Sequence, residues 1–219
     1  MSELLLELLS EEIPARMQPK AAGDLASVIE SNLKNARLDF STLKTFVTPR
    51  RITINVHGLP YQQPDILVEK KGPRVGAPEE AINGFLKSSG VSINDCEQRE
   101  TAKGLVWFST KMDAGRKTSE ILENLIPNAL SQITWEKSMR WGGHKMRWVR
   151  PLHNILCVFD GETVSFNFEH LESGSETEGH RFMCPDTIKI LDFNEYKYKL
   201  SAAKVMLCPV ERQSTIIEQ

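Results

Sequence analysis

The segment from Trp135 to Asn154 holds the densest group of side chains in the chain that could bind an anionic polymer. Five of its residues are Lys or Arg against one acid, Glu136, and it holds three of the four tryptophans. Guanidinium groups fork onto phosphate oxygens, and indole rings stack on unpaired bases. We therefore predict a surface for RNA or for a protein partner here. Its candidate contact residues are Arg140, Trp141, Lys145, Arg147 and Arg150.

A purely structural interpretation of this segment is also open. The tryptophans could be core anchors, because Trp is usually mostly buried. The arginines could pair with the adjacent residues 159–178, which contain six acids and no Lys or Arg. Alternatively, the acidic segment forms a solvated face that repels RNA. The sequence does not decide between these alternatives.

A second motif is Thr48-Pro49-Arg50-Arg51. Pro49 forces a turn or an extended kink between two apolar runs. The two arginines leave an extended chain in opposite directions, so one can reach a ligand while the other pairs internally. The alternative is a turn at the entry of a strand with a surface salt bridge. Arg50 and Arg51 are both candidate contact residues.

A third motif is Gly179-His180-Arg181-Phe182. His180 and Arg181 could form a buried hydrogen-bonding anchor or contact RNA. No nucleophile with an orienting acid lies beside His180 in the sequence, so we predict no catalytic residue here.

A fourth stretch, residues 70–78, has the glycines of a phosphate loop but lacks G-x-x-x-x-G-K-[ST]. Lys71 and Arg74 are candidate contacts within it. The helix that we expect after it could hold an anion at its N-terminus. Glu79 and Glu80, however, already complement the helix dipole there.

Metal and membrane functions have little support in the sequence. The four cysteines form no C-x-x-C pair and the histidines no H-E-x-x-H, so we expect no metal site and reduced, structural thiols. Glu3 and Glu7 interrupt the apolar start, and no run of ~18 apolar residues exists. We therefore expect a cytoplasmic protein with no membrane contact. We also predict no cofactor-binding residues.

The elements that position these motifs follow from periodicity and turn residues. Ile52, Ile54 and Val56 alternate with polar residues, which is typical of a half-buried strand. Pro127 should kink or break its helix. We expect strands at 3–9, 43–48, 51–57, 66–70, 97–101, 105–111, 153–159, 162–168, 187–191 and 204–208. We expect helices at 14–37, 78–89, 117–133 and 193–203, and from 209 onward.

This order of elements has no regular β-α-β repeat, so the sequence predicts an α+β fold with mostly antiparallel sheets and packed amphipathic helices. Each half contains a hairpin and an amphipathic helix. We therefore expect two lobes, 1–112 and 113–219. The last helix reaches Gln219 without a cap, so we expect the natural chain to continue.

Six blocks, in order, resemble the beta subunit of bacterial glycyl-tRNA synthetases. They are LLLELLSEEIPARM at 4–17, TPRRI at 48–52, KGPRVGAPEEAINGFLKSSGV at 71–91, KSMRWG at 137–142, RWVRPLHNIL at 147–156 and GHRF at 179–182. Each block alone is a weak signal, whereas six in order make a chance similarity implausible.

The resemblance implies a heterotetramer of two α and two β subunits. In that family, glycine and ATP (with Mg) react in the α subunit, while the β subunit contributes tRNA binding. The implied partners are therefore the α subunit and tRNA(Gly), and this chain alone is expected to be inactive. The alternatives are a stand-alone RNA-binding module and a segment that mainly docks onto the α subunit.

Overall fold

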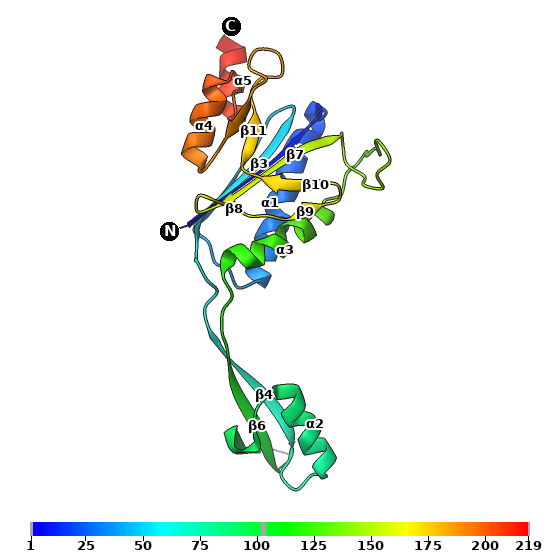
Figure 1. The fold of residues 1–219 in the computed structure, drawn as a ribbon, viewed down its shortest axis with the longest axis vertical. Helices are drawn as coiled ribbons and strands as arrows, with labels where there is room; N and C mark the ends of the chain where they lie inside the picture. Colours follow the sequence, from blue (N-terminus) through cyan, green and yellow to red (C-terminus); the bar gives the residue numbers. More distant parts are fainter. Residues whose placement is uncertain (1, 102–103, 219) are drawn as a thin grey trace. The chain divides into compact units, whose positions relative to one another are not determined.

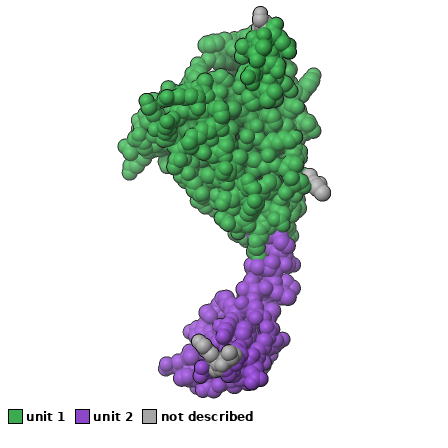
Figure 2. Space-filling model, turned by 180° about the vertical axis from the view of Figure 1, so that it is seen from behind, with its two compact units in different colours: residues 1–62, 116–219 green, residues 63–115 purple. Residues whose placement is uncertain are grey.

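The computed structural model describes residues 2–101 and 104–218 and divides them into two compact units (Figures 1 and 2). Unit 1 comprises residues 1–62 and 116–219, and unit 2 comprises residues 63–115. The expected division into lobes 1–112 and 113–219 is wrong. Strand β1 (Ser2–Ser10) pairs with β7 (Leu152–Phe159), so both halves of the chain build one sheet.

Unit 1 is built on a sheet in the order β2, β3, β1, β7, β10, β9, with β8 paired to β7. Most pairs are antiparallel, and β10 runs parallel to β7. The α+β prediction is therefore confirmed. The remaining strands are β2 (Thr42–Val47), β3 (Arg51–Leu59), β8 (Glu162–Thr163), β9 (Asn167–Phe168) and β10 (Leu171–Gly174).

Helices cover both faces of this sheet. On one face, α1 (Gln18–Asn35) and α3 (Thr118–Ser131) pack against Leu4, Leu6 and Leu8 of β1 (Figure 1). On the other face, α4 (Phe193–Ala202) packs against Leu5. Because successive strand residues point to opposite faces, the run of leucines in β1 supplies both cores. The expected apolar stripe of α1 is confirmed, with Ala21, Leu25, Ile29 and Leu33 buried.

The second helical layer overturns one expectation about β3. Ile52, Ile54 and Val56 are buried as predicted, but Thr53 and Asn55 on the opposite face are buried too. Helix α4 covers that face, and the Tyr196 hydroxyl lies 2.9 Å from Thr53 Oγ1. The strand is therefore buried on both faces rather than half-buried.

Several local expectations hold and others fail. Asp160 and Gly161 both have positive φ, which fits the predicted tight hairpin turn. Of 162–168, however, only Glu162–Thr163 pairs with β7. Helix α3 continues unbroken through Pro127. Residues 204–208 form no strand and lead into α5 (Pro209–Glu218), and β12 (Thr187–Lys189) pairs with an unexpected strand, β11 (Glu176–Glu178).

Unit 2 is a small three-stranded sheet in the order β4, β6, β5 with one α-helix. Gly90 caps the helix in the left-handed conformation, as predicted. Residues 71–74, expected in a loop, extend β4 across a register shift. The hairpin of β5 and β6 is confirmed, while its turn residues, 102–103, lie outside the described residues. The bounds are β4 (Ile66–Arg74), α2 (Glu79–Ser89), β5 (Cys96–Thr101) and β6 (Gly104–Asp113).

None of the described helices is long and apolar enough to cross a membrane.

Candidate functional site

A short segment at the end of β1, residues 10–13, joins the motifs that the sequence singled out. Its backbone N–H groups donate to carbonyls of the Pro49-Arg50 turn and of Pro151. The N···O distances are 2.8 Å from Ser10 to Arg50, 2.6 Å from Ile13 to Pro49 and 2.9 Å from Glu11 to Pro151. Residues far apart in the sequence therefore meet at one end of the sheet.

Arg51 lies inside the fold and forms a buried ion pair with Glu7 of β1. The Arg51 Nε donates to Glu7 Oε2 at 3.1 Å, and both side chains are almost fully buried. The hydroxyls of Tyr196 and Thr177 also donate to the Glu7 carboxylate. Burial, followed by the nearby Glu7 charge, raises the pKa of Tyr196 well above its ordinary value. The prediction that one arginine of the pair bonds internally is confirmed.

Arg51 also positions the Gly179–Phe182 motif. Its Nη2 donates to the carbonyl oxygens of Glu178 and Gly179. Gly179 sits so tightly that a Cβ atom there would lie 2.3 Å from the Cys184 oxygen. The His180 Nδ1 accepts hydrogen bonds from the backbone N–H groups of Phe182 and Met183. The buried network around Arg51 therefore holds the backbone of this loop. Because Nδ1 accepts hydrogen bonds, a neutral His180 carries its proton on Nε2.

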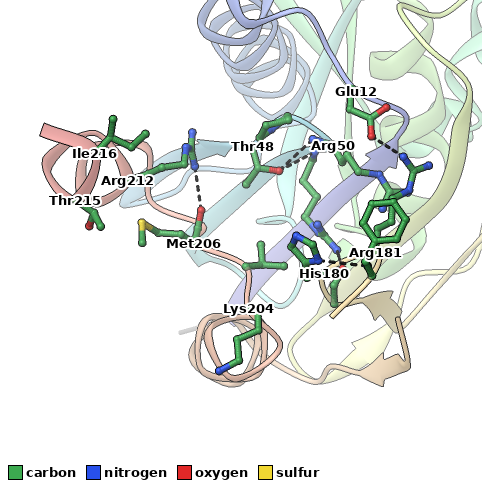
Figure 3. A pocket seen from close by; sticks show the side chains of 15 residues that line it. Glu12, Thr48, Arg50, His180, Arg181, Lys204, Met206, Arg212, Thr215 and Ile216 are labelled. Carbon is green, nitrogen blue, oxygen red and sulfur yellow. Dashed lines mark hydrogen bonds and ion pairs between the residues drawn. The ribbon is translucent and has the colours of Figure 1, made fainter. Parts of the chain in front are cut away.

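A pocket of about 440 Å³ opens between this loop, the Pro49-Arg50 turn and helix α5 (Figure 3). Figure 3 shows Arg212, Thr215 and Ile216 on one side of the pocket and His180 and Arg181 on the other. Its lining is partly apolar. The apolar lining residues are Pro49, Phe182, Val205, Met206 and Ile216.

The charge of the pocket is strongly positive. Five of its lining residues are Arg or Lys, and the one acid, Glu12, pairs with Arg181. Arg51 is compensated by Glu7. Among the described residues, no acid pairs with the three remaining cations. These are Arg50, whose Nε donates to the Ser10 carbonyl, Arg212, which donates to the Met206 and Val47 carbonyls, and Lys204.

Arg181 lies at the rim of the pocket and forms ion pairs with two acids. Its guanidinium contacts Glu11 at 2.9 Å and Glu12 at 2.7 Å, and His153 Nε2 lies 2.9 Å from Glu11. Burial raises the pKa of the Glu11 carboxyl, but hydrogen bonds from His153 and Arg181, together with the Arg181 charge, bring it below its ordinary value. Glu11 therefore stays ionised and holds Arg181 at the rim.

The segment 137–150, which we call the basic loop, is anchored by its own apolar residues. Met139 and Trp148 exchange two backbone hydrogen bonds, of 2.8 and 3.2 Å, and close the loop. Trp148 is 2% exposed and packs edge-on against Trp135 and Phe168. The structural interpretation is therefore right for Trp148, which is a core anchor.

The cations of the basic loop point outward. Arg140, Lys145, Arg147 and Arg150 are all exposed. Arg147 donates to Ser138 at 3.0 Å from Nε to Oγ, and Arg150 to the carbonyl of Val149, both neutral acceptors. Within the described residues, no acid of 159–178 forms an ion pair with any of them. The alternative in which the acidic segment neutralises these arginines is therefore wrong.

Trp141 takes a different position from Trp148. It is half-buried, and its ring packs edge-on against His170 at 5.8 Å between centroids. His170 in turn stacks on His144 at 3.7 Å, with nearly parallel rings. The tip of the basic loop is thus supported by ring contacts with the β9–β10 turn.

The other candidates from the sequence lie elsewhere. Lys71 and Arg74 are exposed on β4 in unit 2 and are not part of the pocket in unit 1. Cys157 is fully buried, whereas the other three thiols are only partly buried. Sequence reasoning missed Lys204, Met206 and Arg212 because no motif marks them. The uncapped helix after Pro209 was their only signal.

The chain is similar in sequence to known proteins. A family model described as Glycyl-tRNA synthetase beta subunit matches residues 4–219. A glycine-tRNA ligase beta subunit of Paracoccus denitrificans is 43% identical over the whole chain. Those of Phenylobacterium zucineum and Rhodospirillum centenum are 46% and 40% identical over 100% and 99% of the chain.

The chain belongs to the family of glycyl-tRNA synthetase beta subunits. It spans about a third of the length of these relatives, with 33% of the Paracoccus protein and 32% of the Phenylobacterium protein covered.

Proposed function

We propose that this chain is a tRNA-binding part of a glycine-tRNA ligase. In this proposal it supports the ATP-dependent attachment of glycine to tRNA(Gly), together with an α subunit that uses ATP with Mg²⁺. The observation that carries the proposal is the basic loop. Its exposed Arg and Lys side chains have no acidic partner among the described residues, and a buried Trp148 fixes their backbone.

The physical argument rests on the phosphate backbone of tRNA. Phosphates supply acceptors onto which guanidinium groups fork with paired, charge-assisted hydrogen bonds. Each neutralised phosphate releases counterions, so binding weakens as salt rises. Because Met146, Trp148 and Val149 are buried while Arg147 and Arg150 are exposed, the loop presents its charges on a rigid base.

The test is a charge reversal, Arg147→Glu with Arg150→Glu, compared with Lys44→Glu. Lys44 is also exposed, but it lies on β2, at the opposite edge of the sheet from β9. We expect the double variant to fold normally, to bind tRNA(Gly) transcript at least tenfold more weakly, and to show a flatter dependence of log Kd on log salt concentration. The Lys44 variant should bind like the natural chain.

The other outcomes assign different roles to the loop. Unfolding of the double variant would make the arginines structural anchors. Loss of α-subunit association with unchanged tRNA affinity would place the loop at a subunit interface. If folding, tRNA affinity and association are all unchanged, the proposal is wrong.

A further inference from the structure

We propose that the pocket between residues 179–182, the Pro49-Arg50 turn and α5 binds a single unpaired nucleotide of an RNA strand. This inference rests on the proposed function and specifies a second contact of the same RNA. Its phosphate lies among the uncompensated cations and its base lies against the exposed apolar lining.

The first argument is charge. Arg50, Lys204 and Arg212 have no acidic partner among the described residues, and they line a pocket that also has apolar side chains. Figure 3 shows Lys204 directed away from His180, so it adds positive potential at the rim rather than a direct contact. A ligand that fits such a pocket carries negative charge next to an apolar body. A nucleotide has both.

The second argument is a largely exposed aromatic ring in the lining of the pocket. Phe182 is 81% exposed, although it follows a loop that is fixed by Arg51 and Gly179. The Arg181 guanidinium lies 5.7 Å from the ring centroid. Proteins that bind single strands stack bases on such aromatic and guanidinium surfaces. A fixed loop that presents a ring to solvent is suited to this contact.

The third argument is continuity with the basic loop. Arg150 precedes Pro151, whose carbonyl accepts from Glu11, and Glu11 contacts Arg181 at the rim of the pocket. A strand bound along the basic loop therefore reaches the pocket across a few hydrogen-bonded residues. An acidic peptide would also satisfy the cations, but neither this continuity nor the exposed ring favours it.

The experiment measures binding of a fluorescein-labelled pentauridylate, which has no secondary structure, and of unlabelled uridine 5′-monophosphate as competitor. Two pairs of variants are compared. The pairs are Phe182→Ala with Met183→Ala, and Ile216→Glu with Ile217→Glu. In each pair both residues are exposed in the natural chain, but only the first residue lines the pocket. Thermal melting checks that all four fold.

We expect Phe182→Ala to weaken pentauridylate binding about tenfold, in line with the loss of one stacked base. Ile216→Glu should weaken it by a similar factor because it places a negative charge in the pocket. The two neighbouring variants should change binding less than twofold. We expect the mononucleotide to bind much more weakly than the pentamer. This result would assign the site to RNA rather than to a free nucleotide. With 5-bromouridine in the pentamer, ultraviolet crosslinks should map to Phe182 or Met206.

Equal binding by both members of each pair would overturn the inference. So would tighter binding of a glutamate-rich peptide than of the pentamer, with the same dependence on Phe182 and Ile216. The two proposals fail separately. If the Arg147 and Arg150 reversal weakens tRNA binding and the pocket variants do not, only the nucleotide pocket is wrong. If the pocket variants weaken pentamer binding and the Arg147 and Arg150 reversal leaves folding, tRNA affinity and α-subunit association unchanged, the basic loop proposal is wrong instead.

Discussion

Arg51 at the start of β3 donates its Nε proton to the Glu7 carboxylate in the middle of β1, 3.1 Å away and sealed from water. Its other nitrogen holds the carbonyls of Glu178 and Gly179. One guanidinium thus connects the core of the sheet to the loop that carries His180. Taking two charges out of water costs several kcal/mol, so the pair stabilises the fold only while it stays complete.

We predict that Arg51→Met lowers the free energy of unfolding by about 3–5 kcal/mol, because it leaves the Glu7 charge buried and unpaired. Urea denaturation followed by tryptophan fluorescence measures this change. Glu7→Leu combined with Arg51→Met should recover most of the loss, since no buried charge remains. Arg50→Met, at a half-buried position one residue away, is the matched control and should cost less than about 1 kcal/mol. Similar losses for the two single variants would contradict the assignment of Arg51 as the internal partner.

A second prediction concerns how the stability of the fold changes at acidic pH. Burial raises the Glu11 pKa, but hydrogen bonds from His153 and Arg181, together with the Arg181 charge, bring it below the ordinary 4.5. A carboxyl with a lowered folded-state pKa stabilises the fold above the unfolded-state pKa, and this contribution is lost as pH falls through the folded-state pKa. The natural chain should therefore have a higher Tm than Glu11→Gln above pH 4.5, with the gap closing at lower pH. Glu136→Gln, at an exposed site, should show no such gap. A gap that widens on acidification would refute the prediction.

A third prediction separates the two tryptophans of the basic loop. Trp148→Ala should lower the free energy of unfolding by about 3–5 kcal/mol, because it empties a packed site between Trp135 and Phe168. Trp141→Ala removes a half-buried ring at the loop tip and should cost much less while weakening tRNA binding. Denaturation and tRNA titration of the two variants check this. If Trp141→Ala destabilises the chain as much as Trp148→Ala, the tip is part of the core.

A fourth prediction concerns unit 2. Gln62 and Lys117, which flank it, form a backbone bridge, so its two ends leave unit 1 side by side. Among the described residues of 63–115, Val106 is the single buried hydrophobic residue. We expect residues 63–115 to exchange amide hydrogens faster than β1 and β7. We also expect replacement of this unit by a short Gly-Ser linker to leave the Tm of unit 1 within a few degrees. Loss of cooperative unfolding on deletion would show that unit 1 depends on unit 2.

Local signals in the sequence predicted much of the fold. The leucine run of β1, the stripe of α1, the Gly90 cap and the Asp160-Gly161 turn each depend on neighbouring residues, and each is confirmed. The lobe boundary failed because the pairing of β1 with β7 joins residues about 150 positions apart. The alternation of apolar and polar residues in β3 wrongly predicted a half-buried strand, because α4 buries the polar face as well.

The candidate site divides in the same way. The sequence showed the Arg50-Arg51 pair and the Gly179–Phe182 motif. It did not show that they lie together, because their contact depends on a hydrogen bond from Arg51 to a residue far along the chain. Lys204 and Arg212 were invisible, since isolated cations near a helix carry no pattern. Only the three-dimensional arrangement shows that the acidic segment, 159–178, forms no ion pair with the basic loop among the described residues.

The central place of β1 also sets an order of events during synthesis. β1 leaves the ribosome before β3 and can pair with it early, but its other edge receives β7, which starts at Leu152. At translation speeds of about 5–20 residues per second, the roughly ninety residues between β3 and β7 take on the order of ten seconds to synthesise. During that time a leucine-rich strand edge stands open, and such edges recruit other chains. The nascent chain is therefore most vulnerable to aggregation, and most in need of chaperone cover, until residue 159 has emerged.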